Sequence, residues 1–550
     1  MDRSYCRCQS SDLGRDMNDV DVVIAGAGPT GLTLACDLAR RGVACRVLER
    51  STEPARGSRG VTLKPRSLEA FDDLGIIDRV LATAHLESRI RFHLGTDLLF
   101  DLHVPPSAAE PSRPYPNPVA LPQWRTESLL RDRLAELGGT VEFGRRVADF
   151  AADDEGVSVV VEDGTRTETV RARYLVGADG GRSRVRSVLA LPFSGVTAED
   201  TRALLADVAL TGLNRENGVH LWMTTDGHLL AARPIPHSDT WQVVASLEPD
   251  ADGHWPQPSL ENLRHAVATR TGPHDIHLTD PSWLSVWRYN LRMVDTYRAG
   301  RVLLAGDAAH VHSPFGGHGM NTGIQDAYNL GWKLALVLHG AADDTLLDSY
   351  ETERLPVGRA ILADSDRRFS TRVPPRVLRP LLRLILKRLF AHQQRATRND
   401  HPTYPASPLT LHRTGRHGPV RAGDAAPDAP VEINGRAARL YDVLRGPHLT
   451  ILAFGPAPNL DLGALGRRIH VHTVASADKH GTTGDDRLVD RTGHLRSAYS
   501  AHDGTVVVIR PDGYIGLMAH TASEQTVTDY LHRIGLRIPQ HPPDFLHTGC

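Results

Sequence analysis

The stretch Val20-Asp-Val-Val-Ile-Ala-Gly-Ala-Gly-Pro-Thr-Gly31 decides the fold. Its apolar first half predicts a buried strand, and the glycines that follow fit the pattern G-x-G-x-x-G. Residues 32–41 have helical character, and residues 43–48 predict a second strand that ends at Glu49. A strand, glycine turn, helix and strand in this order are typical of a Rossmann-like α/β domain that binds a dinucleotide.

Each part of this unit has a physical role in holding a dinucleotide. Gly26 permits the tight turn, Gly28 lets the backbone approach the pyrophosphate, and Gly31 lets the helix pack on the strand. The helix begins with Pro29 and Thr30, and its N-terminus directs amide donors and a positive dipole at the phosphates. Glu49 can accept hydrogen bonds from ribose hydroxyls. The pattern alone does not distinguish FAD from NAD.

Length, charge and composition exclude several classes of protein. At 550 residues and about 150 residues per domain, we expect three or four folding units. A net charge of -2 gives no field that recruits nucleic acid. No apolar run approaches the ~20 residues that span a bilayer, so we expect no stable membrane insertion. The polar first twenty residues do not resemble a signal peptide, which favours a cytoplasmic location.

Cysteines and histidines do not indicate a metal or disulfide site. The five cysteines form no framework of paired spacings. His310, His312 and His318 lie close together in the sequence but lack the ligand spacing of a metal site. We therefore expect no metal.

Changes of pattern along the chain predict its organisation. The α/β character of the first unit stops where short alternating runs begin, and it returns at Arg301, so a sheet-based α+β module is inserted into the first domain. A basic amphipathic helix over 375–390 and a linker rich in Pro, Thr, His and Arg precede a separate C-terminal unit. The predicted parts are a flexible tail over 1–19, a dinucleotide-binding domain over 20–191 and 301–375, an inserted substrate domain over 192–300, a helix and linker over 376–420, and a C-terminal domain over 421–550.

Two later stretches each end a strand and enter a helix. The first is Gly177-Ala-Asp-Gly-Gly-Arg-Ser-Arg-Val-Arg186, and the second is Arg301-Val-Leu-Leu-Ala-Gly-Asp-Ala-Ala-His310, which is followed by Pro314-Phe-Gly-Gly-His-Gly-Met-Asn-Thr-Gly-Ile-Gln. With the glycine fingerprint, these motifs occur in the same order in the single-component (class A) FAD-dependent aromatic hydroxylases. Over about residues 20–362 the sequence resembles that family, of the phenol hydroxylase and aromatic polyketide hydroxylase type. The C-terminal domain resembles the family's thioredoxin-like appendage, most recognisably at Arg510-Pro-Asp-Gly-Tyr-Ile.

The resemblance implies FAD as the cofactor and assigns residues to it. Asp307 would accept from hydroxyls on the ribityl or ribose side of FAD, and the helix near Met320 would aim its amides at the flavin N1/O2 edge. Asp179 and Arg186 match a motif associated with both FAD and NADPH, whereas Arg59 and Gln123 match contacts to FAD. The predicted cofactor-binding residues are Gly26, Gly28, Pro29, Thr30, Gly31, Glu49, Arg50, Arg59, Gln123, Asp179, Arg186, Asp307, Pro314, Gly317, Gly319, Met320 and Asn321.

The resemblance also implies the reaction. NADPH or NADH reduces FAD, dioxygen converts the reduced flavin to a C4a-hydroperoxide, and a phenolic or polycyclic aromatic substrate of the polyketide type takes up oxygen. No side chain is predicted as a catalytic acid, base or nucleophile. The inserted domain would roof the substrate and exclude water. The candidate lining residues are Trp222, Met223, Arg233 and Pro314, although core packing explains the Trp and Met equally well.

Three alternatives remain open at the level of the sequence. Baeyer–Villiger oxygen insertion, or another oxidative tailoring of a polyketide, uses the same fold and cofactor. A flavin-binding redox sensor is the non-enzymatic alternative, and NADPH consumption stimulated by a substrate would separate the two classes.

The C-terminal domain has no C-x-x-C pair and cannot run dithiol chemistry by itself, which favours a structural or oligomerisation role. The amphipathic helix over 375–390 leaves a homodimer open.

Overall fold

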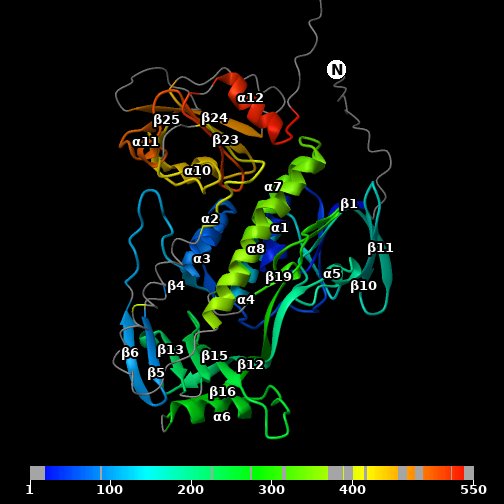
Figure 1. Ribbon diagram of the computed structural model, residues 1–550, viewed down its shortest axis with the longest axis vertical. Helices are drawn as coiled ribbons and strands as arrows, with labels where there is room; N and C mark the ends of the chain where they lie inside the picture. The colour runs from blue at the N-terminus through cyan, green and yellow to red at the C-terminus, as the bar shows by residue number, and fades with distance from the viewer. Residues whose placement is uncertain are drawn as a thin grey trace, which may run out of the picture.

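Three β-sheet units lie one above another along the long axis of the computed structural model (Figure 1). The structure describes residues 19–86, 89–103, 105–224, 227–272, 275–312, 317–369, 388, 401–413, 418–455, 468–476, 487–521 and 523–537. Residues 1–18 of the expected tail, nearly all of the helix expected over 375–390, and Pro314 lie outside the described residues.

The first unit contains the glycine fingerprint and is built on a mixed sheet. Its strand order is β17-β18-β11-β1-β2-β8, and β10 and β9 continue from β11. β1 pairs in parallel with both β2 and β11, and its residues Val22, Val23 and Ile24 are fully buried, as expected for a central parallel strand. The α/β prediction is confirmed for this unit. The strands are β1 (Asp19–Ala25), β2 (Cys45–Glu49), β8 (Val141–Phe143), β9 (Arg146–Ala152), β10 (Val157–Glu162), β11 (Thr167–Gly177), β17 (Arg298–Ala299) and β18 (Val302–Leu304).

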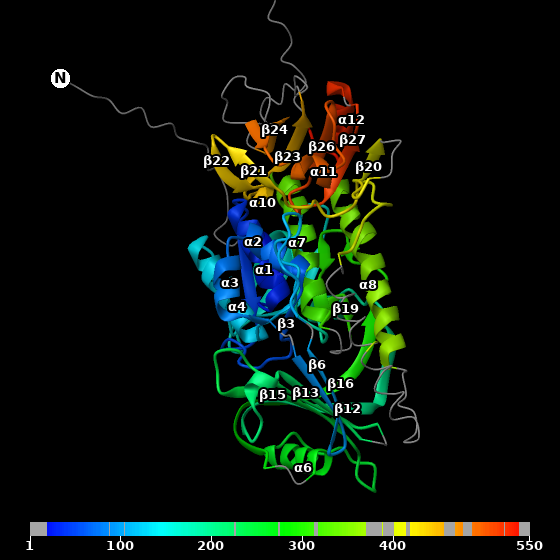
Figure 2. The same cartoon turned by 90° about the vertical axis from the view of Figure 1, so that its left-hand side faces the viewer.

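Helices α1 and α7 pack against each other beside this sheet, and α4 packs on the other flank of α1. Figure 2 shows the long helices α7 and α8 side by side; the C-terminal end of α7 and the first turns of α8 lie next to the third unit. A small sheet, β3 (Thr62–Leu63), β7 (Val119–Ala120) and β4 (His85–Leu86), lies next to them. The helical segments are α1 (Pro29–Arg40), α2 (Pro65–Asp73), α3 (Ile77–Thr83), α4 (Gln123–Glu136), α5 (Arg184–Val188), η2 (Gly306–Ala308), α7 (Gly319–Leu338), η3 (Asp344–Leu347) and α8 (Asp348–Phe369).

The second unit is a sheet whose outer face is covered by α6 (Leu260–Thr271), at the end of the molecule opposite the third unit (Figure 1). Its strand order is β19-β16-β12-β15-β14-β13-β5-β6. The range expected for this unit, 192–300, omits β5 and β6, because β5 pairs with β13 across a long sequence separation that local patterning does not reveal. The elements are β5 (Arg89–Leu94), β6 (Asp97–His103), β12 (Ser194–Thr211), η1 (Arg215–Asn217), β13 (Val219–Met223), β14 (Leu229–Pro234), β15 (Thr240–Leu247), β16 (His277–Met293) and β19 (His310–Val311).

The third unit is a mixed sheet in the order β20-β27-β26-β23-β24-β25-β21-β22. β23 pairs in parallel with β24 and antiparallel with β26, and β26 pairs antiparallel with β27. The expected apolar runs near 449–454, 469–474 and 506–509 are all strands. The elements are β20 (Leu411–Arg413), β21 (Pro430–Ile433), β22 (Arg436–Arg439), α10 (Leu440–Leu444), β23 (Leu449–Phe454), β24 (Ile469–Ser476), β25 (Arg487–Asp490), α11 (His494–Ala498), β26 (Thr505–Ile509), β27 (Ile515–Ala519) and α12 (Glu524–Arg533).

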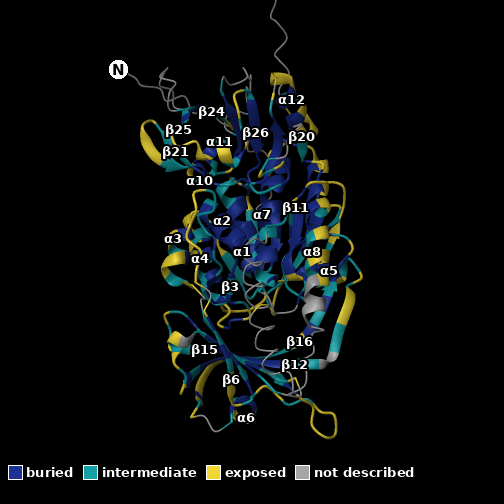
Figure 3. Ribbon diagram, turned by 60° about the vertical axis from the view of Figure 1, so that its left-hand side comes forward, coloured by how far each residue is buried: buried dark blue, intermediate teal, exposed yellow. Residues whose placement is uncertain are grey.

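A buried ion network joins the third unit to α7 and α8. The Arg510 guanidinium donates to Glu353 Oε1 at 2.5 Å and Oε2 at 2.9 Å, and Lys333 Nζ donates to Glu353 Oε2 at 2.8 Å. Asp512 accepts from Arg510, and Asn329 bridges Glu353 and Asp512. The four charges balance, so their burial is compensated by their own pairing. Figure 3 shows this junction and the first sheet as a continuous buried region.

The helices of the described ranges include none that is both long and apolar enough to cross a membrane.

Candidate functional site

The glycine turn is closely packed on two sides and open on the third. A Cβ on Gly26 would lie 2.4 Å from the Ala178 carbonyl oxygen, and the φ of Gly26 is +101°. A Cβ on Gly31 would lie 2.0 Å from the carbonyl oxygen of Gly26, because the helix packs directly on the turn. Gly28 caps the N-terminus of α1, which begins with Pro29, and a Cβ there would meet no protein atom within 4 Å. The space beside Gly28 therefore admits a phosphate close to the backbone, as the fingerprint predicts.

Two carboxylates stand beside this turn. Glu49 ends β2, and its Oε2 accepts from the Ala27 amide at 3.0 Å while Oε1 accepts from the Ser51 amide at 2.9 Å. Asp179 Oδ2 accepts from the Arg184 amide at 2.7 Å and caps α5. Asp179 Oδ1 is buried and has no hydrogen-bond partner among the described residues, and such an oxygen is costly unless a ligand donates to it.

Several predicted cofactor residues also have contacts within the protein. Arg186 donates to the carbonyls of Ala308 and Gly181, both at 2.8 Å, and so ties the α5 loop to η2. Thr30 Oγ1 would lie 2.5 Å from a Cβ on Gly306, which shows that α1 packs tightly on η2 through this side chain. Arg50 is exposed after the end of β2.

Asp307 lies in η2, in the segment that joins β18 to β19. The residue is exposed. Burial by the surrounding protein nevertheless raises the pKa of its carboxyl group, and this effect outweighs His310 and Arg59, which lower it. Arg59 is exposed and acts electrostatically on Asp307 and Glu127 together. The structure therefore brings Arg59 and Asp307 to the same space.

The N-terminus of α7 is fixed by the side chain of Asn321. Asn321 Nδ2 donates to the carbonyls of Thr62 at 2.8 Å and Gly317 at 2.7 Å, and Oδ1 accepts from the Lys64 amide and Ser67 Oγ, both at 2.8 Å. Every polar atom of this side chain is thus used within the protein. The amides of Gly319, Met320 and Asn321 precede the first intrahelical bond, from Thr322 to His318, and within the described residues none of them has an acceptor. These amides, with the helix dipole, can face an anionic flavin edge.

Gln123 and Met320 lie on either side of Gly60. A Cβ on Gly60 would be 3.6 Å from both Gln123 Oε1 and Met320, and Gln123 Nε2 donates to Glu127 at 2.8 Å. Burial raises the pKa of Glu127 to about 6, against the effects of Gln123 and Arg131. Gln123 and Met320 therefore lie together beside Gly60, and Arg59 lies within electrostatic reach of both Asp307 and Glu127. We refer to the region of Gly28, Gln123, Met320, Asp307 and Arg59, which the cofactor would occupy, as the FAD groove.

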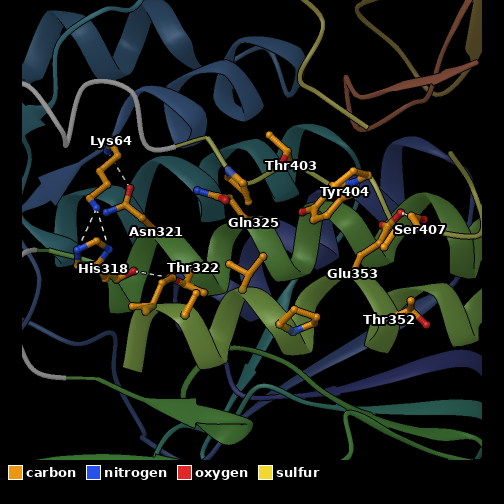
Figure 4. A pocket seen from close by; sticks show the side chains of 17 residues that line it. Lys64, His318, Asn321, Thr322, Gln325, Thr352, Glu353, Thr403, Tyr404 and Ser407 are labelled. Atoms are coloured by element: carbon orange, nitrogen blue, oxygen red, sulfur yellow. Dashed lines mark hydrogen bonds between the residues drawn. The ribbon is translucent and has the colours of Figure 1, made fainter. Parts of the chain in front are cut away.

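A cavity of about 430 Å³ adjoins the N-terminus of α7 (Figure 4). Lys64 and His318 lie at one end, where Lys64 Nζ is 2.8 Å from His318 Nδ1. Residues of α8 form an apolar wall, and the segment 402–407 closes the far end near Glu353. His318 and Asn321 line the cavity and also lie at the N-terminus of α7, so the cavity reaches this terminus. The apolar wall consists of Pro356, Val357, Ala360 and Ile361.

A buried ionic chain below α7 was not predicted from the sequence. His310 Nε2 is 2.6 Å from Asp326 Oδ2, Asp326 Oδ1 accepts from Arg354 Nε at 2.6 Å, and Arg354 Nη1 donates to the Tyr404 hydroxyl at 2.9 Å. Asp326 also accepts from the Gly306 amide at 3.0 Å. The chain therefore fixes the loop that carries Asp307. Asp326 directly follows the motif that begins at Pro314, but no pattern in the sequence indicated its partners.

The two faces of the second sheet separate the predicted substrate residues. Trp222 is 1% exposed and belongs to the core that packs against α6, on the face away from the first unit. Met223 packs against the small cluster of Phe92 and Phe100. Arg233 points the other way and donates to Thr62 Oγ1 at 3.4 Å, close to Gly317. The structure thus brings Arg233 to the site but does not bring Trp222 there.

Trp283 and Gln242 are contacts to the first unit that sequence reasoning missed. A Cβ on Gly57 would lie 2.2 Å from the Trp283 ring, and Gln242 donates to the Ser58 carbonyl. The alternating pattern of β15 and β16 indicates which residues within each strand point to the same face of the sheet. It does not indicate which of the two faces meets the first unit.

The described residues fit FAD. The open side of Gly28 suits a pyrophosphate, Glu49 and Asp307 suit hydroxyls, the unpaired Asp179 Oδ1 suits a donor, and the α7 amides suit the flavin.

Comparison with known proteins agrees with this fit. A family described as FAD binding domain matches residues 19–365, and the HcaD C-terminal domain matches residues 423–534. The chain is 41% identical over 522 residues to a flavin-dependent monooxygenase of Mycobacteroides abscessus, covering 93% of this chain and 99% of the relative. It is 35% identical over 546 residues to 6-methylpretetramide 4-monooxygenase of Streptomyces rimosus, covering 94% and 93%. A solved ternary complex of aklavinone-11 hydroxylase with FAD and aklavinone matches at 25% identity with a TM-score of 0.76, covering 95% of this chain and 100% of that one. This chain, as its three motifs predict, belongs to the single-component FAD-dependent aromatic hydroxylase family.

Proposed function

We propose that this enzyme hydroxylates a phenolic or polycyclic aromatic compound of the polyketide type, with dioxygen and NADPH or NADH as co-substrates. One oxygen atom enters the ring, the other leaves as water, and the reduced nucleotide supplies two electrons. Bound FAD supplies the redox chemistry by accepting hydride and reducing dioxygen. The names of two relatives, which refer to 6-methylpretetramide and aklavinone, support the substrate class.

The cavity beside α7 is the observation that carries this proposal. Its volume of about 430 Å³ lies within the range of small-molecule sites. His318 and Asn321 place its mouth directly next to the amides of Gly319 and Met320, where the flavin edge would lie. The apolar wall on α8 suits fused aromatic rings, because such rings bury large apolar areas.

Lys64 and His318 orient the substrate and favour its reactive form. A cation within about 4–6 Å stabilises a phenolate relative to the phenol. A phenolate pushes electron density into its ring, which makes the ring carbon a better nucleophile. The Lys64–His318 pair would therefore draw the phenolic oxygen to the mouth of the cavity and turn the ring towards the α7 terminus. Arg233 and the second sheet exclude water from the opposite side of this terminus.

The C-terminal unit supports the function structurally. We propose a thioredoxin-like fold for it, because a parallel strand pair followed by an antiparallel hairpin, in the order β24-β23-β26-β27, is the core arrangement of that fold. Its buried ions hold α7 and α8 through Glu353. We further propose that the second sheet acts as the substrate domain.

The test is NADPH and NADH oxidation by the FAD-loaded protein, with and without a panel of phenols and polycyclic quinones. We expect strong stimulation by one class and a product that carries one additional oxygen atom. Val357→Trp fills the cavity and should abolish the stimulation while FAD stays bound; Val196→Trp, at a strand position that is 59% exposed, is the control. Full stimulation in Val357→Trp would place the substrate elsewhere. A lactone product would indicate Baeyer–Villiger insertion instead, and a bound flavin that no compound affects would favour a sensor.

A further inference from the structure

A second cavity, of about 550 Å³, lies between α4, the loop 53–56 and the inner face of the second sheet. In all three views of the fold, α4 lies directly above β15 (Figures 1–3). Its lining combines arginines, a tryptophan, a buried carboxylate and hydroxyl groups of both units. None of these side chains belongs to the FAD groove or to the cavity beside α7.

Asp207 presents an unpaired oxygen at this cavity. The residue is 1% exposed, and its Oδ2 accepts from the Ser58 amide at 2.9 Å. Asp207 Oδ1 is buried and has no hydrogen-bond partner in the part of the chain that the structure describes. A buried carboxylate oxygen without a donor is strongly unfavourable. A ligand that brings an amine or hydroxyl group would satisfy it.

Two arginines and a tryptophan surround the same space. Trp124, Ser128 and Arg131 lie at i, i+4 and i+7 of α4 and so share one face of that helix. Arg131 is 3.9 Å from Glu127, and Arg56 is 3.1 Å from Glu53 on an exposed loop, so neither guanidinium is held in a fully paired buried site. Arginine binds phosphate through paired donors, and an indole stacks on flat heterocycles.

The position of the cavity relates it to the flavin site. Gln123 and Glu127 occupy the neighbouring face of α4 and border the FAD groove next to Gly60 and Arg59. Arg56 and Arg59 belong to the same loop, with Arg56 at the cavity and Arg59 at the groove. The chain has one glycine fingerprint, which the FAD groove uses. A second dinucleotide must therefore bind outside the glycine turn. The motif of Asp179 and Arg186, which the resemblance associates with both FAD and NADPH, does not line this cavity.

We propose that this cavity binds the adenosine-phosphate half of the reduced pyridine nucleotide. Phosphate groups pair with Arg56 and Arg131, the adenine stacks on Trp124, and its amino group donates to Asp207 Oδ1. The nicotinamide half then extends along the loop 53–59 towards the flavin. This assignment rests on the proposed function, because it names the site of that reaction's electron donor.

The experiment is calorimetric titration of NADP⁺ into the FAD-loaded protein, since NADP⁺ binds without reducing the flavin. We expect Arg131→Gln, Trp124→Leu and Asp207→Asn each to raise the Kd by about tenfold or more, the loss typical of one hydrogen bond to a charged group or one aromatic stack. Arg146→Gln removes the same charge from the β9–β10 hairpin, where Arg146 pairs with Glu162, and should leave the Kd unchanged. FAD content and Tm are measured on every variant, which identifies any that fail to fold.

Competition identifies the half that is bound. Adenosine 2′,5′-bisphosphate or ADP should displace NADP⁺, and nicotinamide mononucleotide should not. The reverse order would overturn the assignment, as would displacement of NADP⁺ by an aromatic substrate. If the wild-type protein oxidises NADPH or NADH with a substrate but the three variants bind NADP⁺ as tightly as wild type, this inference alone is wrong. If no aromatic compound stimulates oxidation by wild type, the proposed function fails, whatever the titrations show.

Discussion

Two polar regions lie along α7 and use their polar atoms in opposite ways. Near its C-terminal half, Asn329 and Lys333 join Glu353, Arg510 and Asp512 in a network whose members bond to one another. Around its N-terminus, the three first amides have no acceptor within the described residues, and burial raises the pKa of the nearby Asp307.

The difference shows how to tell a structural polar cluster from a ligand site. Buried charged groups whose hydrogen bonds and ion pairs are all made within the protein need no ligand, and a ligand would not stabilise them further. Polar atoms that are positioned but unsaturated are stable only when something else bonds to them. The polar atoms of Asn321 all bond within the protein, whereas Asp179 and Asp207 each have one buried carboxylate oxygen with no hydrogen-bond partner among the described residues.

Breaking the saturated network should have the largest effect. Glu353→Leu leaves Arg510 and Lys333 buried without their carboxylate, and we expect a loss of about 3–5 kcal/mol in the free energy of unfolding, measured in urea. Glu162→Gln, which removes the exposed partner of Arg146, should change it by less than about 1 kcal/mol. Equal losses in both variants would show that the network is no more than a surface ion pair.

The same network predicts a pH dependence. Burial disfavours the charged form of Glu353, but Arg510 and Lys333 outweigh it and hold the pKa of this carboxyl group below its ordinary value. A lowered native pKa stabilises the fold above the unfolded pKa, and this contribution is lost as the pH falls below it. Wild type should therefore lose stability in acid more steeply than Glu353→Leu, measured as Tm from pH 7 to pH 3.

The glycine turn tests the other region through a pair of identical substitutions. Gly31→Ala places a Cβ 2.0 Å from the Gly26 carbonyl oxygen, so we expect about 1–3 kcal/mol of destabilisation together with loss of FAD. Gly28→Ala meets no protein atom, and its φ of -73° suits alanine. It should leave the FAD-free protein as stable as wild type but weaken FAD binding by more than about tenfold, because the pyrophosphate needs that space. Tight FAD binding by Gly28→Ala would refute the placement of the pyrophosphate.

Asp307→Asn should separate stability from cofactor affinity. Burial raises the pKa of Asp307, so the charged carboxylate destabilises the FAD-free fold once the pH rises above the ordinary aspartate range. The variant should therefore have a higher Tm than wild type at pH 7 without FAD, and the same Tm at pH 3. Its FAD affinity should fall by about tenfold, as expected when a charged acceptor is lost. A variant that is no more stable than wild type and binds FAD equally well would place Asp307 outside the site.

Local patterns predicted the parts of the fold that local physics determines. The β1–α1–β2 unit follows from one apolar run, three glycines and a second apolar run, all within about thirty residues. The strands of the third unit follow equally from short apolar runs. β5 and β6 belong to the second sheet because β5 pairs with β13. His93 of β5 and His220 of β13 are 127 residues apart in the sequence, so no local pattern predicts this pairing.

The site was predictable where a motif determines the backbone conformation. It was less predictable where side chains bond to residues that are distant in the sequence. Gly26, Gly28 and Gly31 occupy their expected positions because their role is steric. Arg186 and Asn321 lie in the expected motifs, but Arg186 donates to two protein carbonyls, and Asn321 bonds to two carbonyls, a backbone amide and a serine hydroxyl. Arg510 was noticed in its motif, yet its partner Glu353 is 157 residues away, so the ion network could not be foreseen.

The two faces of the second sheet give the comparison with the smallest expected effects. Alternation with period two shows which residues share a face of a strand, but it does not show which face meets the first unit. Arg233→Gln loses the contact to Thr62 near Gly317 and should lower substrate-stimulated turnover several-fold with no more than about 0.5 kcal/mol change in stability, because the side chain is only part-buried. Trp222→Phe, in the core against α6, should cost about 1 kcal/mol or more in unfolding free energy and leave turnover per folded molecule unchanged. Stopped-flow turnover and urea unfolding, measured on both variants, show which face of the second sheet meets the substrate. If Trp222→Phe alters turnover and Arg233→Gln does not, the substrate lies on the α6 face, and the assignment of the inner face to the active site is wrong.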